Sequence, residues 1–133
     1  MKKIILLFSA LLAFATLANA QNSIPDPAVS LGKIKGATTT VEELRNNHRL
    51  ELHSGITSVE RFEVSLLFIN KNGEERYFGP FTVKWSQNLP DNIYALIDES
   101  PSELKKIFVE GIRVRDSSGT QRLCNAIILT CNK

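Results

Sequence analysis

The chain alternates apolar and polar side chains most clearly in the stretch Phe62-Glu63-Val64-Ser65-Leu66-Leu67-Phe68. Successive side chains of a β-strand point to opposite faces, so this period of two predicts a strand with one buried face and one wet face. Asn72-Gly73 follows, and the pair Asn-Gly favours the left-handed backbone angles of a tight hairpin turn. The stretch therefore predicts the first strand of an antiparallel hairpin.

The predicted return strand starts near Arg76 and is interrupted by Gly79-Pro80. Because proline cannot donate a ladder hydrogen bond, this pair indicates an edge strand, a bulge or a change of sheet rather than a central strand. The alternation resumes with Phe81, Val83 and Trp85 on one side of the strand. We therefore expect the second strand of the hairpin to be irregular.

Four aromatic residues gather in this return strand. A sandwich of this size needs its aromatic side chains inside, so we expect the cluster to pack in the core. The alternative is that some of them lie outside and form a recognition patch. The four residues are Tyr77, Phe78, Phe81 and Trp85.

The rest of the chain supplies further short elements. Ile93, Leu96 and Ile97 recur at helical spacing, which predicts about two helical turns that end before Pro101. Thr40-Val41-Glu42-Glu43 has the pattern of a capping box at the start of a helical turn. Strands are expected at 29–35, 50–53, 107–115 and 127–131, with a bulge at Glu110-Gly111, an added helical turn at 102–106 and a chain reversal at 116–119.

These elements predict an all-β protein. Six or seven short strands, with turn signals roughly every ten residues, favour an antiparallel β-sandwich with one or two short helices. Residues 28–133 are long enough to form one domain with its own core. We divide the chain into a leader (1–20), an extended segment (21–27) and this domain.

The first twenty residues follow the order of a secretory signal peptide. Lys2 and Lys3 form a positive start, residues 4–17 are almost wholly apolar, and Ala18-Asn19-Ala20 supplies the small residues of a cleavage site. We expect cleavage after Ala20 and a periplasmic or secreted protein that does not span a membrane. A retained membrane anchor is the alternative, although the apolar run is shorter than the roughly 20 residues of a spanning helix.

Removal of the leader changes the charge balance. The whole chain has 16 basic and 14 acidic residues, and loss of Lys2 and Lys3 leaves 14 of each, so the formal net charge becomes zero. Proteins that bind nucleic acids need an excess of basic residues on their surface. We therefore expect no nucleic-acid partner.

Two stretches carry a resemblance to a known family. Residues 27–37 join an extended apolar segment to a Gly-x-x-Lys-Gly-small motif, and residues 108–125 form a strand, an Asp/Gly turn and an Arg-containing return. Together they resemble the start and the end of the C-terminal periplasmic domain of GldM, a protein of gliding motility and type IX secretion. The resemblance implies an immunoglobulin-like sandwich in the periplasm, as a free-standing copy of that domain that is accessory to the secretion or gliding machinery.

Cys124 and Cys131 are the two cysteines of the chain. If the residues between them form one extended strand, the gap is roughly 23 Å at about 3.3 Å per residue. A disulfide needs Cα atoms within about 7 Å. Export favours a disulfide and this geometry favours two thiols, so we expect thiols and keep the disulfide as the alternative.

The residues that could carry chemistry form no recognisable site. His48 and His53 are five apart, which suits neither a helical pair nor neighbours on one face of a strand, and no cysteine or carboxylate cluster completes a zinc set. We therefore predict a non-catalytic domain without a cofactor or a metal.

An exported domain of this kind would act by binding. We predict a protein-interaction domain that presents a sheet face or an unpaired edge strand to another periplasmic or outer-membrane-associated protein. The candidate interaction residues are Lys33, Lys35, Tyr77 and Trp85. The alternative is a small-ligand-binding or inhibitor domain that uses the loops at one end of the sandwich.

Overall fold

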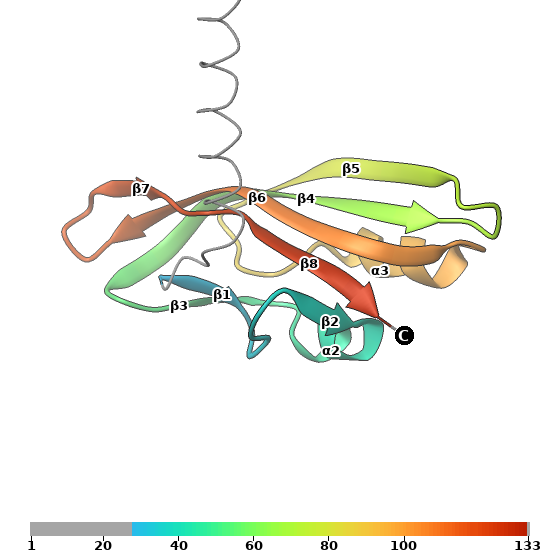
Figure 1. The fold of residues 1–133 in the computed structure, drawn as a ribbon. Helices are drawn as coiled ribbons and strands as arrows, with labels where there is room; N and C mark the ends of the chain where they lie inside the picture. Colours follow the sequence, from blue (N-terminus) through green and yellow to red (C-terminus); the bar gives the residue numbers. More distant parts are fainter. Residues whose placement is uncertain (1–27, 133) are drawn as a thin grey trace, which may run out of the picture.

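A six-stranded sheet carries the fold, and a second layer covers one of its faces (Figure 1). The structure, a computed structural model, describes residues 28–132; the predicted leader and the segment 21–27 lie outside the described residues. The strands are β1 (Val29–Leu31), β2 (Thr38–Thr40), β3 (Leu50–Leu52), β4 (Ile56–Ile69), β5 (Glu75–Lys84), β6 (Glu103–Asp116), β7 (Gln121–Leu123) and β8 (Ile127–Asn132), and the helices are α2 (Val41–Asn46) and α3 (Asp91–Glu99).

The large sheet has the strand order β2-β8-β6-β4-β5, and β7 also pairs with β6. Its two longest strands, β4 and β6, are 14 residues each and form its centre. The pairs are antiparallel except for β2 and β8, which are parallel. The sheet therefore ends at β5 on one side.

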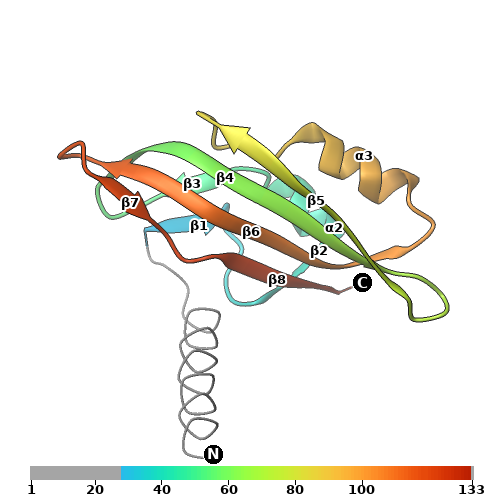
Figure 2. The same ribbon diagram turned by 90° about the horizontal axis from the view of Figure 1, so that it is seen from above.

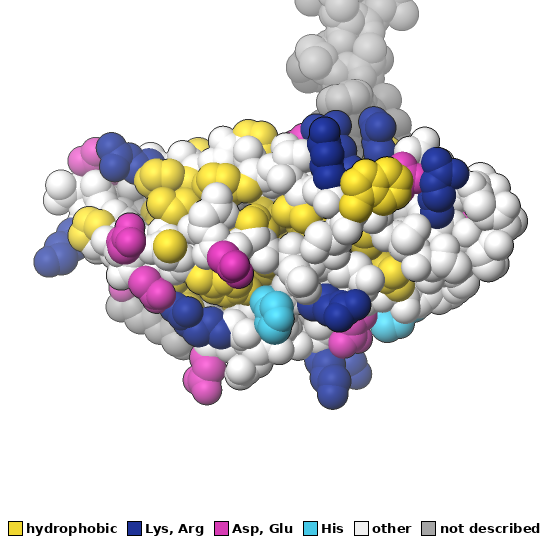
Figure 3. Space-filling view, turned by 180° about the vertical axis from the view of Figure 1, so that it is seen from behind, with side chains coloured by type: hydrophobic (Ala, Val, Ile, Leu, Met, Phe, Trp, Pro, Cys, Tyr) yellow, Lys and Arg dark blue, Asp and Glu magenta, His cyan; other side chains and the backbone are white. Residues whose placement is uncertain are grey.

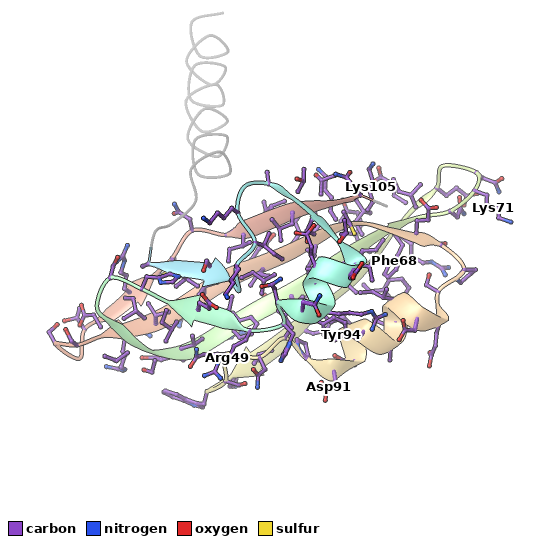
Figure 4. The ribbon with its side chains drawn as sticks, turned by 90° about the horizontal axis from the view of Figure 1, so that it is seen from below. Arg49, Phe68, Lys71, Asp91, Tyr94 and Lys105 are labelled. Atoms are coloured by element: carbon purple, nitrogen blue, oxygen red, sulfur yellow. The ribbon has the colours of Figure 1, made fainter. Side chains whose placement is uncertain are left out.

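The second layer consists of a two-stranded sheet and the two helices. β1 and β3 pair antiparallel, and Figure 4 shows them with α2 and α3 in front of the large sheet. This arrangement confirms an all-β, sandwich-like architecture with two short helices. The second sheet has only two strands, so the helices supply much of the covering layer.

The core forms where the predicted apolar face of β4 meets this layer. Phe62, Val64, Leu66 and Phe68 are at most 1% exposed, and they share one buried cluster with Ile93 of α3. Each fully buried side chain of this size contributes about 2 kcal/mol to folding. The alternation in β4 therefore fixes which face of the sheet receives the second layer.

The hairpin between β4 and β5 also follows the prediction. The amide of Gly73 donates to the carbonyl of Asn70 at 3.0 Å, and the Asn70 side chain accepts from two further amides of the turn. The ladder then shifts by one residue, because Val64 pairs with Phe81 and Leu66 with Phe78. The predicted irregularity at Gly79-Pro80 is thus a bulge in an edge strand.

Glycine is required at this bulge. Gly79 has a φ of +111°, a conformation that side chains rarely tolerate, and a Cβ there would lie 2.7 Å from the carbonyl oxygen of Val64. The Thr40 half of the predicted capping box is confirmed as well, since the Thr40 hydroxyl accepts a hydrogen bond from the Glu43 amide at 3.1 Å. The Glu43 carboxylate accepts from the same hydroxyl at 3.4 Å. The predicted bulge near Glu110 appears as a register shift between β4 and β6.

Two predicted elements are wrong. The strand expected at 29–35 ends at Leu31, because Gly32 has a φ of +55° and its backbone lies against Asn47, whose Oδ1 accepts from the Lys33 amide at 2.7 Å. The helical turn expected at 102–106 is absent, because β6 begins at Glu103 and pairs with the end of β4. Both errors arise from contacts between residues distant in the sequence.

Candidate interaction surface

The four predicted interaction residues lie on two separate parts of the fold. Lys33 and Lys35 are exposed on the connection between β1 and β2, in the second layer. Tyr77 lies in β5 and is 62% exposed, and Trp85 directly follows β5 and is 71% exposed. The structure therefore places one aromatic residue in β5 and the other directly after it, and leaves the two lysines apart from them.

The prediction that the aromatic cluster packs in the core is wrong for Tyr77 and Trp85. Tyr77 pairs with Leu67 and takes the sheet face turned away from the second layer, where its ring centre lies 6.2 Å from that of Phe108. Trp85 stands beyond the last residue of β5 with a φ of +55°, which few residues other than glycine adopt. The largest buried aromatic side chains belong to β4 instead.

In the described part of the chain, β5 is the longest strand that forms an edge of a sheet. β5 has ten residues and pairs with β4, and among residues 28–132 no strand pairs with its other side. An edge strand presents N–H and C=O groups that can pair with another chain. Seen from above, α3 lies beside this edge (Figure 2).

A strip of half-buried apolar side chains runs between β5 and α3. Figure 3 shows hydrophobic side chains gathered on this side of the molecule. A hollow of about 180 Å³ lies in the strip, between the first half of β5 and the end of α3. We call this the β5–α3 strip, which consists of Phe78, Phe81 and Val83 of β5 and Leu96 of α3.

The face of β5 that is turned away from the second layer carries a charged residue at each end of the strand. Glu75 and Lys84 are exposed, and neither makes an ion pair with any other residue in the range 28–132. Lys84 pairs in the ladder with Arg61, and Arg61 pairs on its other side with Arg113 of β6. Three cations therefore stand in one row across β5, β4 and β6.

A second hollow lies at the end of the sheet where β8 finishes. It has a volume of about 700 Å³ and is bounded by the start of α2, the end of α3, the start of β6 and the end of β8. Cys131 borders it, and burial together with the negative charge of Glu43 raises the pKa of this thiol, while Lys105 opposes the rise. The thiol therefore stays protonated and is a poor nucleophile.

Cys124 and Cys131 are both buried, and no disulfide joins them. The amide of Cys124 donates to the carbonyl of Ile112 at 2.8 Å, whereas Thr130, the neighbour of Cys131, pairs with Lys106. These positions on β6 place the two cysteines about 20 Å apart at the usual rise of a strand. This separation exceeds the Cα distance that a disulfide can bridge.

A polar cluster joins α2 to α3 and lines a hollow of about 410 Å³. The Tyr94 hydroxyl donates to the carbonyl of Leu44 at 2.9 Å, and Figure 4 shows Tyr94 between the two helices. Burial raises the pKa of Tyr94 to about 12, against the opposing charge of Arg45. The Arg45 side chain also forms an ion pair with Asp98. His48 Nδ1 lies 3.3 Å from the backbone carbonyl oxygen of Arg45. Because the Tyr94 hydroxyl donates its proton to a backbone carbonyl of α2, this side chain links the two helices.

The second histidine also has a hydrogen-bond partner close by. His53 Nε2 lies 3.0 Å from the hydroxyl of Ser30, and both histidines are exposed. In residues 28–132 no group of three or more His, Cys, Asp or Glu side chains is placed to hold a metal ion. The same residues contain no helix that is long and apolar enough to cross a membrane.

No protein-family model matches the chain, and no curated protein matches it either. The residues of this candidate surface that the sequence pattern missed are Lys84 and Leu96. Gly79-Pro80 pointed to the edge strand that carries Lys84, whereas nothing local linked Leu96 to that edge.

Proposed function

We propose that the chain is a non-catalytic protein-interaction domain that accepts an extended segment of a partner protein along the open edge of β5. The observation that carries this proposal is the ten-residue edge of β5 beside a strip of half-buried apolar side chains. In such complexes the backbone hydrogen bonds supply affinity, and pockets for alternate side chains supply specificity.

The β5–α3 strip would receive every second side chain of the added segment. Phe78, Phe81 and Val83 face the second layer, as their ladder partners in β4 do, so an added strand would turn alternate residues toward the same side. Leu96 and the adjoining hollow of about 180 Å³ leave space there for a side chain. An apolar residue at these positions would remove further apolar surface from water.

The bulge at Gly79-Pro80 makes this edge selective. A long regular edge would pair with many unrelated strands, and proteins commonly blunt such edges with proline, bulges and charge. Here the bulge divides β5 into two short arms, 75–78 and 81–84. A partner must therefore match one arm, or both arms with the shift between them.

The cellular setting of the proposal comes from the sequence. The signal-peptide pattern of residues 1–20 supports a partner in the periplasm or outside the cell. The resemblance of residues 27–37 and 108–125 to the C-terminal domain of GldM supports an immunoglobulin-like fold and an accessory role near the type IX secretion or gliding machinery. The partner would then be another periplasmic or outer-membrane-associated protein.

A site-specific photo-crosslinker tests the proposal in cells. We would place p-benzoylphenylalanine at Thr82, which is exposed in the second arm of β5, and at Lys35 as the matched control on the other predicted surface. We expect a protein adduct from Thr82 and none from Lys35. Adducts from Lys35 alone, or from neither position, would contradict a docking edge at β5.

The hollow at the end of the sheet favours a second candidate function. Its volume of about 700 Å³ lies within the range of small-molecule sites, and it is formed by the ends of helices and strands that meet at one end of the sheet. This supports the small-ligand-binding or inhibitor alternative. A thermal-shift screen with metabolites and glycans tests it: a ligand that raises Tm for the wild type and not for Lys105→Ala would favour it, since Lys105 lines the hollow.

A further inference from the structure

The row of three cations continues toward the open edge of β5. Arg113, Arg61 and Lys84 are neighbours in register across β6, β4 and β5, and they stand on the sheet face turned away from the second layer. A strand added to β5 would place its own residue next to Lys84 in the same row. The side chain at that position of the partner therefore decides whether the row gains a fourth charge or is neutralised.

Charge within the chain leaves this row only partly balanced. Arg61 Nη2 lies 2.9 Å from Glu63 Oε1, whereas Lys84 and Arg113 make no ion pair with a residue in the range 28–132. Like charges directly opposite each other in a sheet are destabilising, and opposite charges are stabilising. A carboxylate beside Lys84 would thus be favoured, and a fourth cation would be disfavoured.

Trp85 lies at the same end of β5. Its side chain is 71% exposed although its backbone is held at a φ of +55°, a conformation that usually persists only where the surrounding structure imposes it. Tryptophan is enriched among the residues that anchor a protein partner.

The geometry points to an acidic partner segment: the extended segment that pairs with β5 carries an Asp or Glu beside Lys84 and apolar residues at the alternating positions that face the β5–α3 strip. This inference rests on the proposed function, because it needs β5 to be a docking edge. It adds the chemistry of the partner at one defined position. At the other end of β5, Glu75 provides the opposite charge, so the direction of the segment is also biased.

Selection from a random decapeptide library displayed on phage tests the inference. The target is the chain purified from cells that express the full sequence, as wild type, as Lys84→Glu and as the control Lys71→Glu. Lys71 is exposed in the turn before β5 (Figure 4), whereas Lys84 and its row lie at the far end of that strand. We expect wild type and Lys71→Glu to select Asp or Glu within an alternating apolar pattern, and Lys84→Glu to select Lys or Arg at that position.

Binding of synthetic peptides then gives the size of the effect. Trp85 is the single tryptophan of the chain, so its fluorescence reports binding next to Lys84. Exchanging the selected acid for lysine should weaken binding to the wild type about fivefold and strengthen binding to Lys84→Glu by a similar factor. Circular dichroism of each variant verifies that it is folded.

The outcomes separate this inference from the proposed function. Peptides that crosslink to Thr82 but show no acidic preference, or no switch with Lys84→Glu, would overturn the acidic segment and leave the docking edge. Selection that yields no peptide at β5 would overturn both. The last experiment measures binding of the wild type and of Lys84→Glu to vesicles with about one third anionic phospholipid. If the wild type binds these vesicles, Lys84→Glu does not, and no acidic peptide is selected, the row binds a lipid surface and the inference is wrong.

Discussion

Replacing Gly79 by alanine should destabilise the chain more than an ordinary loop glycine substitution. The added Cβ would lie 2.7 Å from the Val64 carbonyl oxygen and 3.1 Å from the Cα of Ser65, both backbone atoms that cannot turn aside. The backbone would also have to hold alanine at a φ of +111°. We expect about 1 kcal/mol from the backbone conformation and about 2 kcal/mol from the contact, hence about 3 kcal/mol in total.

Gly36→Ala is the matched control for this prediction. Gly36 has a φ of +83°, and a Cβ there would meet no atom within 4 Å, so only the conformational cost of about 1 kcal/mol should appear. Urea unfolding followed by circular dichroism measures both variants. With a slope of about 2 kcal/mol per molar urea, Gly79→Ala should lower the midpoint by about 1 M more than Gly36→Ala. Equal midpoints for the two variants would refute the steric argument.

Three further predictions concern the core, the cap and the acid limit of stability. Phe62→Ala should cost about 4 kcal/mol in urea unfolding, because the side chain is fully buried; a cost below 1 kcal/mol would place it outside the core. Thr40→Ala should cost about 1 kcal/mol through loss of the cap of α2, whereas the exposed neighbour Thr38→Ala should be nearly neutral. Hydrogen bonds, first from the Ser118 hydroxyl, lower the pKa of Asp116 below its ordinary value of 3.8. The stability from this group is therefore present above pH 3.8 and lost as the pH falls through the folded pKa, so Asp116→Asn should flatten the acid limb of a stability–pH curve.

The features that the sequence predicted correctly are those that local chemistry determines. The alternation in β4, the Asn72-Gly73 turn and the bulge at Gly79-Pro80 each depend on residues that are adjacent in the chain. The strand β2 was missed because Thr38–Thr40 has no apolar period, and it forms only by parallel pairing with β8, some ninety residues later. Contacts of that kind leave no trace in a local pattern.

The candidate site shows the same division between local and distant determinants. The period of two placed Trp85 in phase with Phe81 and Val83, but β5 ends at Lys84 and the backbone of Trp85 turns to a positive φ. The pattern therefore extended the strand by one residue too many and assigned the indole to the core. The ladder partner of Lys84 is Arg61, and a row of like charges of this kind becomes visible only when the register is known.

Under the proposed function, the same features of β5 that protect its edge would also define what can bind there. Without Gly79-Pro80 the ladder to β4 would run unbroken and the outer edge would offer a regular template to any strand. The bulge limits pairing to two short arms, and the charges of Glu75 and Lys84 at their far ends disfavour a segment with the wrong sign or the wrong direction. Protection against unselective pairing and the proposed recognition of one partner would therefore both require a bulged, charged edge at β5. A substitution that makes the edge more regular, such as one that removes the bulge, should increase aggregation and reduce selectivity together.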